Sequence, residues 1–223
     1  MRVEKGNMTN IKGAILDVDG TLIDSMWKWI EVEAEYLISL GIVPHRNLRE
    51  ALHTLNLLEA AEYFRTEYGI DKSAQKITDE KNSMMEVFYS EEAEMKAGVI
   101  PVLDALKARG IKMCVATATD RYLVEAALRR LGILNYFEKV FTCSEEKTSK
   151  TCPDIFLRAA EFLGTDITET IVVEDALHAI RAAKSAGFPI VAVYDLSAEY
   201  HQDEIKELCD HYYLNLGEMM AIL

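Results

Sequence analysis

The chain of 223 residues is organised around the stretch GAILDVDGTLIDS, residues 13–25. Its first four residues are apolar, which is typical of a buried strand of a parallel sheet, and the strand ends where Asp17 and Asp19 begin. Ligand sites of open α/β sheets lie beyond the carboxyl ends of such strands. Two carboxylates at that place, followed by a flexible Gly20-Thr21 turn, suit a divalent metal and a nucleophile acting on one phosphorus atom.

The composition argues against several classes of protein. Half of the residues are hydrophobic, which allows a sizeable core, but no run approaches the roughly 18 apolar residues that span a bilayer. The formal net charge is −13 and no Lys/Arg cluster occurs, so we expect no nucleic-acid partner. Residues 1–10 lack an apolar signal region, and the four cysteines form no CxxC pair. We therefore expect a cytoplasmic protein with free thiols and no zinc site, without a membrane partner, that is a monomer or a weak dimer.

The spacing of apolar residues divides the chain into two kinds of structure. Helical spacing predicts helices at about 27–38, 48–55, 60–68 and 73–89, and no residue run in this region alternates like a strand. From Gly98 onward, strands and helices alternate, which indicates a parallel sheet with right-handed crossovers. Five strands are predicted, at 13–16, 112–116, 139–143, 170–173 and 190–194, with an edge segment near 212–214. The predicted fold is α/β: a Rossmann-like core with a five-stranded parallel sheet (residues 1–24 and 98–223) and an inserted α-helical cap (residues 25–97).

Polar side chains follow three of the predicted strands. Asp17 and Asp19 end the first, the run 117–120 (Thr-Ala-Thr-Asp) ends the second, and Glu174-Asp175 ends the fourth. The carboxyl ends of parallel strands share one edge, so these groups should converge, and Lys150 precedes a predicted helix on the same edge. Phosphoryl transfer needs such parts: a nucleophilic carboxylate, an acid/base, a hard cation, and donors for the phosphoryl oxygens.

Four segments carry a resemblance to a known family. They are DVDGTL (residues 17–22), ATAT (116–119), KTCPDIF (150–156) and VVEDA (172–176). Because these segments occur in this order and at these separations, the chain resembles the haloacid dehalogenase superfamily, in the branch of β-phosphoglucomutase-like phosphatases. The resemblance covers almost the whole chain except the details of residues 40–97.

The resemblance implies a role for each site residue. It makes Asp17 the nucleophile and a magnesium ligand, and Asp19 the general acid/base, whose backbone carbonyl also faces the metal. Asp175 would hold Mg²⁺, with Glu174 as a further ligand or as a partner of the ligands.

The resemblance also implies how the phosphoryl group is bound. Thr117 and the amide of Ala118 would bind its oxygens, and Lys150 would brace the nucleophile and the phosphate. An acid at position 19 argues against a dehalogenase, because displacing halide from carbon needs no acid for the leaving group.

Simpler interpretations exist for several of these residues. Asp17 and Asp19 could be turn or capping residues, Thr117 an ordinary hydroxyl at a strand end, and Glu174 an ordinary acid at a helix N-terminus. Lys150 could be a solvated loop lysine, and Lys147 is its nearest competitor. We expect His178 to be structural, and Trp27 and Trp29 to belong to the core of the cap rather than to stack on substrate.

Departures from the family pattern bear on the substrate. Ala176 and Ala179 stand where the family often has serine and glycine, and Trp29 stands where β-phosphoglucomutases have histidine. Residues 48–59 form a plain amphipathic pattern instead of a substrate loop with Gly-x-x-Arg.

These departures favour a hydrolase over a mutase. We expect Mg²⁺-dependent hydrolysis of a small phosphomonoester, a sugar phosphate or a nucleotide-like metabolite, through an aspartyl-phosphate. A phosphosugar mutase is the main alternative, and a non-catalytic binding protein on the same scaffold is a remote one. A phosphonate-cleaving enzyme is a further alternative, but it would need a Schiff-base lysine at the start of the cap. The chain offers only Lys28 there, and its placement is too weak to count.

Overall fold

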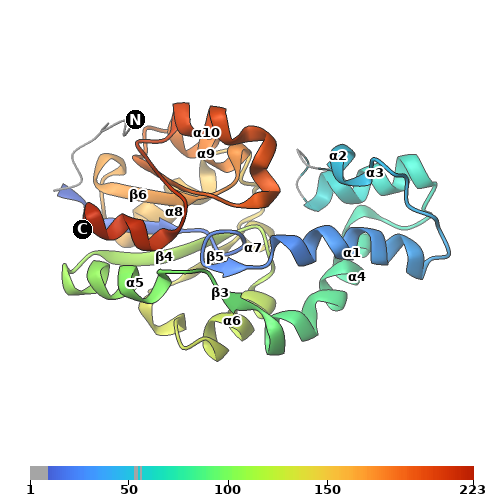
Figure 1. Ribbon diagram of the computed structural model, residues 1–223, viewed down its shortest axis with the longest axis horizontal. Helices are drawn as coiled ribbons and strands as arrows, with labels where there is room; N and C mark the ends of the chain where they lie inside the picture. Colours follow the sequence, from blue (N-terminus) through green and yellow to red (C-terminus); the bar gives the residue numbers. More distant parts are fainter. Residues whose placement is uncertain (1–9, 53–54, 56) are drawn as a thin grey trace.

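The computed structural model describes residues 10–52, 55 and 57–223, and its main layer is a parallel sheet (Figure 1). The sheet has six strands in the order β5-β4-β1-β6-β7-β8, and every neighbouring pair is parallel. The strands are β1 Gly13–Leu16, β4 Lys112–Thr117, β5 Val140–Thr142, β6 Thr170–Glu174, β7 Ile190–Val193 and β8 His211–Tyr213. β1 is central, between β4 and β6, so the opening stretch of the sequence is also the middle of the sheet.

The prediction of five strands was one too few. All five predicted strands are present, and β8 adds a sixth where the sequence indicated only an edge segment. β8 pairs with β7 in register from Val191 with His211 to Val193 with Tyr213. It is three residues long, and its first two residues are only partly buried, so it lacks the apolar run that marks a central strand.

Helices cover both faces of the sheet. Strand residues alternate between the faces, so Ala14 and Leu16 pack on one side while Ile15 packs on the other. The first face is covered by α5 (Val99–Ala108), α6 (Arg121–Arg130) and the C-terminal turn Leu216–Ala221. The second is covered by α8 (Asp154–Leu163), α9 (Leu177–Ser185) and α10 (Gln202–Leu208). Burial of each large apolar side chain in these layers contributes about 1.5–3 kcal/mol, which fixes the sheet and its edges.

A second group of helices projects from the carboxyl edge of the sheet (Figure 1). It consists of α1 (Met26–Ser39), α2 (Leu48–Leu52), α3 (Leu57–Tyr68) and α4 (Ala74–Val87), which continues into a π-helical turn, Phe88–Glu92. These helices have their own hydrophobic cluster, which includes Tyr36, Leu37, Phe64 and Ile77. The chain leaves and re-enters the sheet-bearing part through β2 (Ile23–Asp24) and β3 (Glu94–Met95), which pair antiparallel. β2 ends just before the first residue of the predicted insertion, and β3 lies just inside its predicted end.

Asp120 links the two groups of helices. It occupies the N-cap position of α6, which Asp favours, but its side chain makes no capping bond. Its carboxylate accepts hydrogen bonds from Asn82 Nδ2 on α4 (2.7 Å) and from Ser144 Oγ (2.6 Å), which lies on the short helix α7 (Cys143–Glu146). These two donors take the place of the helix amides.

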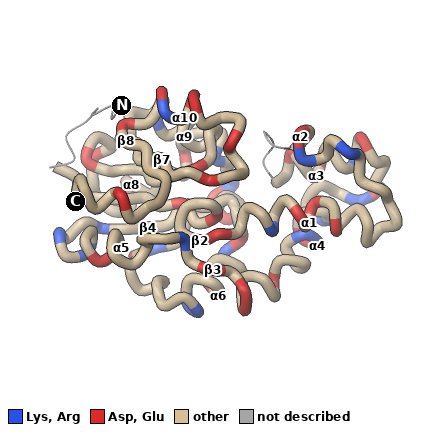
Figure 2. The backbone as a smooth tube through the Cα atoms, in the orientation of Figure 1, with Lys and Arg blue, Asp and Glu red and all other residues tan. Residues whose placement is uncertain are grey.

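Other sequence expectations concern the whole chain. Lys and Arg residues are distributed over both parts of the molecule (Figure 2). The four cysteines are free, as expected. No helix in the described part of the chain is long and apolar enough to cross a membrane.

Gly98 provides a test of how the C-terminal turn packs against the start of α5. Its φ is +83°, and a Cβ added there would lie 2.2 Å from the backbone N of Gly217. We predict that Gly98→Ala lowers the free energy of unfolding by about 3 kcal/mol or more, because left-handed strain adds to a backbone clash.

Gly110→Ala is the matched control, since its φ is +70° and no atom lies within 4 Å of the added Cβ. It should lose only the strain, about 1–2 kcal/mol. Urea unfolding measures both, and equal losses would contradict the packing described for Gly98.

Candidate active site

The strand register brings the predicted site residues to one place. Leu16 of β1 pairs with Val115 of β4 on one side and with Val173 of β6 on the other. Asp17 follows directly, and its backbone N–H still donates to the carbonyl of Val173 (3.0 Å). Asp17, Thr117 and Glu174 therefore lie side by side at the carboxyl edge, and all three are buried.

Lys150 joins two of these strand ends. Its Nζ donates to Asp17 Oδ1 and to Glu174 Oε1, the latter at 2.6 Å. Only 4% of the lysine side chain is exposed, which excludes the interpretation as a solvated loop lysine. Lys147, its competitor, is exposed.

Burial and like charge set the electrostatics of the site. Burial raises the pKa of Asp17 to about 8, against the opposing effect of Lys150. Burial also raises the pKa of Asp175 well above its ordinary value, and the charges of Glu174 and Asp17 add to this. Burial alone would lower the pKa of Lys150, but Asp17 and Glu174 outweigh it and keep the lysine charged. One lysine thus faces three buried acids, and the raised pKa values of Asp17 and Asp175 mean that these acids tend to hold protons until further positive charge reaches the cluster.

Those three acids form a candidate metal site. Each of Asp17, Glu174 and Asp175 offers a carboxylate oxygen within 4.8 Å of the others. The donor set contains only oxygen, which is what Mg²⁺ prefers in proteins. The side chain of Asp19 is not part of this cluster.

Glu174 and Asp175 are held by the loops around them. Glu174 Oε2 accepts the backbone N–H groups of Asp175 (2.9 Å) and Ala176 (3.0 Å), which precede Leu177, the first residue of α9. Asp175 Oδ1 accepts a hydrogen bond from Thr21 Oγ1 (3.0 Å). A Cβ on Gly20 would lie 2.4 Å from Asp175 Oδ2, so the close approach of this carboxylate requires glycine at position 20.

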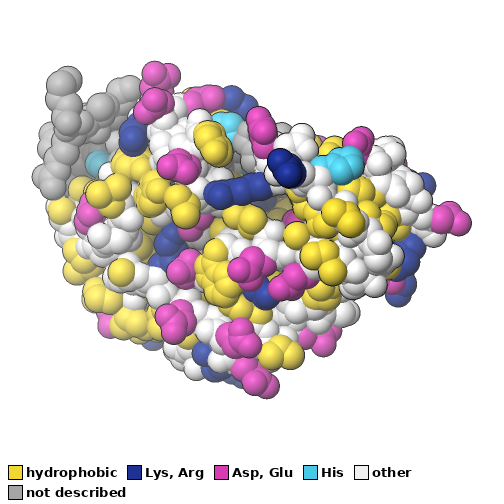
Figure 3. All heavy atoms as spheres, turned by 45° about the vertical axis from the view of Figure 1, so that its right-hand side comes forward, with side chains coloured by type: hydrophobic (Ala, Val, Ile, Leu, Met, Phe, Trp, Pro, Cys, Tyr) yellow, Lys and Arg dark blue, Asp and Glu magenta, His cyan; other side chains and the backbone are white. Residues whose placement is uncertain are grey.

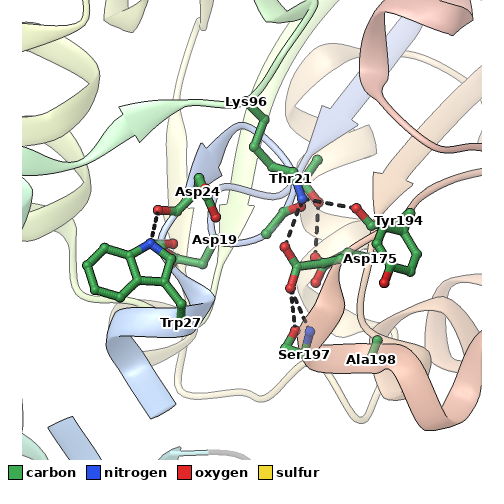
Figure 4. A network of polar contacts seen from close by, with 12 residues as sticks. Asp19, Thr21, Asp24, Trp27, Lys96, Asp175, Tyr194, Ser197 and Ala198 are labelled. Atoms are coloured by element: carbon green, nitrogen blue, oxygen red, sulfur yellow. Dashed lines mark hydrogen bonds and ion pairs between the residues drawn. The ribbon is translucent and has the colours of Figure 1, made fainter. Parts of the chain in front are cut away.

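Lys96 ties the turn after Asp17 and Asp19 to the opposite loop (Figure 4). It follows β3, and its Nζ donates to the carbonyls of Gly20 (2.6 Å) and Tyr194 (3.0 Å) and to Asp195 Oδ2 (2.8 Å). The chain segment that returns from the helical insertion is therefore anchored at the edge of the site. No sequence pattern indicated a role for this lysine.

The carboxylate of Asp19 accepts hydrogen bonds from three hydroxyl groups. Oδ1 accepts from Ser25 Oγ (2.6 Å) and from Tyr89 Oη, and Oδ2 accepts from Thr119 Oγ1 (2.7 Å). Tyr89 in turn accepts the indole N–H of Trp29 at 2.9 Å. Burial, and then the charge of Asp19, raise the pKa of Tyr89 well above its usual value, so Tyr89 remains a protonated donor.

Sequence patterns point to two of these three partners of Asp19 and not to the third. Ser25 and Thr119 lie inside quoted motifs. Ser25 is the N-cap of α1, but its side chain makes no capping bond and donates to Asp19. Tyr89 lies 70 residues from Asp19 in the chain, and no pattern indicated it.

Trp27, Trp29 and His178 were expected to be core or structural residues, and the structure places them differently from one another. Trp29 is buried and also borders the site cavity. Trp27 is 47% exposed, so the prediction that it belongs to the core was wrong: it lies on the outer side of α1, where its indole N–H donates to the carbonyl of Asp24 (3.1 Å). His178 lies on α9 as expected, borders the cavity, and has a pKa lowered by burial.

One cavity of about 700 Å³ contains all the predicted site residues. Among its lining are Asp17, Asp19, Thr117, Ala118, Lys150, Glu174 and Asp175. The cavity continues from the sheet edge to α1, α2 and α3. In the space-filling view, Lys/Arg and His side chains lie along a hollow with hydrophobic side chains beside it (Figure 3).

Comparison with known proteins agrees with this geometry. Residues 11–187 match the family model of the haloacid dehalogenase-like hydrolases. The chain belongs to this family. It is 29% identical to the fructose-1-phosphate phosphatase YqaB of Escherichia coli over 195 residues, covering 81% of this chain and 95% of that protein. It is 26% identical over 196 residues to the Arabidopsis thaliana chloroplastic protein SUPPRESSOR OF QUENCHING 1, covering 82% of this chain but only 18% of that protein.

The fold has a close structural counterpart. The crystal structure of CbbY from Rhodobacter sphaeroides in complex with phosphate superposes with a TM-score of 0.83 at 24% identity, covering 96% of this chain and 99% of that one. The family match and the phosphatases among the relatives make the protein a phosphoric monoester hydrolase.

The raised pKa of Asp17 predicts how the stability of the metal-free protein depends on pH. The folded state binds this proton more tightly than the unfolded chain, whose Asp pKa is about 4. Stability from this group is therefore full below about pH 4 and is lost as pH rises to about 8. Asp17→Asn should stabilise the metal-free protein relative to wild type, and the gain should be larger at pH 8 than at pH 5.

Melting curves in chelator at several pH values measure this difference. Added Mg²⁺ should raise the melting temperature of the wild type more at pH 8 than at pH 5, and should have little effect on Asp17→Asn. A difference between variant and wild type that does not change with pH would contradict the assignment of charge in the cluster.

Proposed function

We propose that the protein is a Mg²⁺-dependent phosphatase that hydrolyses a small phosphomonoester through an aspartyl-phosphate on Asp17. The observation that carries this proposal is the buried contact of Lys150 with Asp17 at the end of the central strand. Lys150 engages Oδ1 of Asp17, which leaves Oδ2 for attack on phosphorus. The name of the E. coli relative supports sugar phosphates as a substrate class, and nucleotide-like metabolites are the second class to test.

In the first step, Asp17 attacks phosphorus and the bond from phosphorus to the ester oxygen breaks. Asp19 gives a proton to the departing oxygen. In the second step, Asp19 takes a proton from water, the water oxygen attacks the acyl phosphate, and Asp17 leaves as a carboxylate. Phosphate is released, and both aspartates return to their starting protonation states.

The negative charge that develops on the phosphoryl oxygens needs donors close by. Lys150 supplies a charge, and the Thr117 hydroxyl and the Ala118 amide would supply hydrogen bonds. Thr117 is suited to this because its Oγ1 accepts the N–H of Thr119 (3.1 Å), which leaves its own hydroxyl proton to donate.

The residues present fit a divalent cation. Asp17 and Asp175 would hold it with Glu174, whose oxygens also bind Lys150 and two amides, and the backbone carbonyl of Asp19 completes the proposed set. When bound, Mg²⁺ neutralises part of the charge of the phosphoryl group.

We further propose that residues 25–97 form a cap over a core made of residues 1–24 and 98–223. The cap lines the cavity opposite the sheet edge and supplies Tyr89 to Asp19. Closure of such a cap excludes bulk water until Asp19 activates one molecule.

The mutase alternative is less well supported. At the position of the mutase histidine, Trp29 directs its only polar hydrogen at Tyr89. Supplying a hexose 1-phosphate with catalytic bisphosphate distinguishes the two activities, because a mutase forms the isomeric hexose phosphate and a phosphatase forms free phosphate.

Asp17→Asn tests the nucleophile. We expect kcat for a generic aryl phosphate to fall at least about 1,000-fold, because the amide does not attack phosphorus. Asp24→Asn is the control: it lies seven residues later, is exposed, and should retain wild-type kcat. Magnesium-dependent turnover that survives in Asp17→Asn would contradict the assignment of Asp17 as the nucleophile.

Tyr89→Phe tests the support of Asp19 from the cap. The variant removes one hydroxyl donor and keeps the ring, so kcat should fall about tenfold while KM changes little. Tyr122→Phe, which removes an exposed tyrosine hydroxyl from α6, should leave both constants unchanged. A change in KM alone would mean that Tyr89 acts on substrate binding and not through Asp19.

A further inference from the structure

We propose that the preferred substrate is an amphipathic phosphomonoester whose leaving group has an aromatic or aliphatic body, ahead of the sugar phosphates that the name of the E. coli relative suggests. This inference rests on the proposed function, because it places the phosphoryl group at Asp17 and the leaving group in the rest of the cavity. The cavity, about 700 Å³, is far larger than a phosphoryl group requires and falls in the range of sites for drug-sized ligands.

The wall formed by α1 is largely apolar. Met26, Trp29, Ile30 and Ala34 line the cavity at helical spacings of three, four and eight residues from Met26. They form one continuous face of the helix, and it begins directly beside Asp19. A leaving group attached to a phosphoryl group at Asp17 would extend along this face.

Glu33 is the ionisable residue on that face, and its charge is neutralised from within the cap. Both of its carboxylate oxygens accept hydrogen bonds from Lys81 Nζ, at 2.8 and 2.9 Å. Lys81 is fully buried, and its Nζ also lies 5.3 Å from the ring of Phe64. A buried pair of this kind is costly to break, so Glu33 is committed to Lys81 rather than to a substrate hydroxyl.

The facing walls continue the apolar surface. Leu48 and Leu52 of α2, Leu57 and Ala60 of α3, and Leu177 of α9 line the cavity. Among the polar lining residues, Arg181 donates to Glu204 (2.7 Å), and burial lowers the pKa of His178, which favours its neutral form. Four further polar residues outside α1 also border the cavity: His45, Arg49, Ser197 and His201.

This lining discriminates between two kinds of leaving group. Along the α1 face, sugar hydroxyls would lose water without gaining hydrogen-bond partners from the described side chains. Methylene or aromatic groups would instead gain from burial, and each buried methylene should raise kcat/KM about three- to fourfold.

A series of substrates with matched leaving-group chemistry tests the inference on the wild-type enzyme with Mg²⁺. Ethyl, butyl, hexyl and phenethyl phosphate and glucose 6-phosphate all release a primary alcohol, so their intrinsic reactivities are similar. We expect kcat/KM to rise along the alkyl series and to be at least ten times higher for hexyl phosphate than for glucose 6-phosphate.

The outcomes separate the two proposals. Hydrolysis that does not increase with chain length, or that favours glucose 6-phosphate, overturns the inference and leaves the phosphatase proposal standing. Absence of Mg²⁺-dependent hydrolysis for every ester, a generic aryl phosphate included, overturns the proposed function itself.

A pair of variants on one helix locates the effect. Ile30→Gln places an amide on the cavity face of α1 at nearly constant size and should lower the ratio of kcat/KM for hexyl phosphate to that for glucose 6-phosphate at least fivefold. Ile38→Gln is the control, because Ile38 lies on the same helix, is 62% exposed and does not line the cavity. Equal ratios in the two variants would contradict the assignment of the α1 face, and the wild-type series decides the inference if Ile30→Gln does not fold.

Discussion

The contact of Lys150 with Asp17 and Glu174 is the interaction on which the rest of the site depends. It places one charged amine between two carboxylates at the ends of adjacent strands, where water is excluded. Without the lysine, the buried acids would repel each other still more strongly and would hold protons to higher pH. Even with it, the pKa of Asp17 is raised to about 8, so a divalent cation that binds the cluster would displace protons from it.

The sheet provides this arrangement, and the loops refine it. The parallel register puts Asp17 beside the ends of β4 and β6, and the left-handed backbone of Gly20 lets Asp175 approach the turn closely. Asp19 is supported differently, because its donors come from the start of α1, from the π-helical turn, and from the loop after β4. The position of the helical insertion and the orientation of the proposed acid/base are therefore coupled through Tyr89 and Ser25.

Much of this could be predicted from the sequence, since apolar strand runs, helix spacing and polar residues at strand ends are local patterns. They located five strands, the helical insertion, and the seven residues that share the cavity. β8 was missed as a strand because it is short and half-buried. Tyr89 and Lys96 were missed because their partners are distant in the chain. Ser25 and Asp120 have the sequence signature of helix caps, but donors and acceptors brought near by the fold replace the capping bonds.

The central claim is that Asp17 becomes phosphorylated during turnover, and borohydride trapping tests it most directly. Borohydride reduces an aspartyl-phosphate to homoserine, so peptide mass spectrometry of enzyme quenched during turnover identifies the modified residue. The account predicts conversion at Asp17 that requires substrate and Mg²⁺. Modification at another residue, or continued turnover with Asp17 unmodified under conditions that trap acyl phosphates, would contradict it.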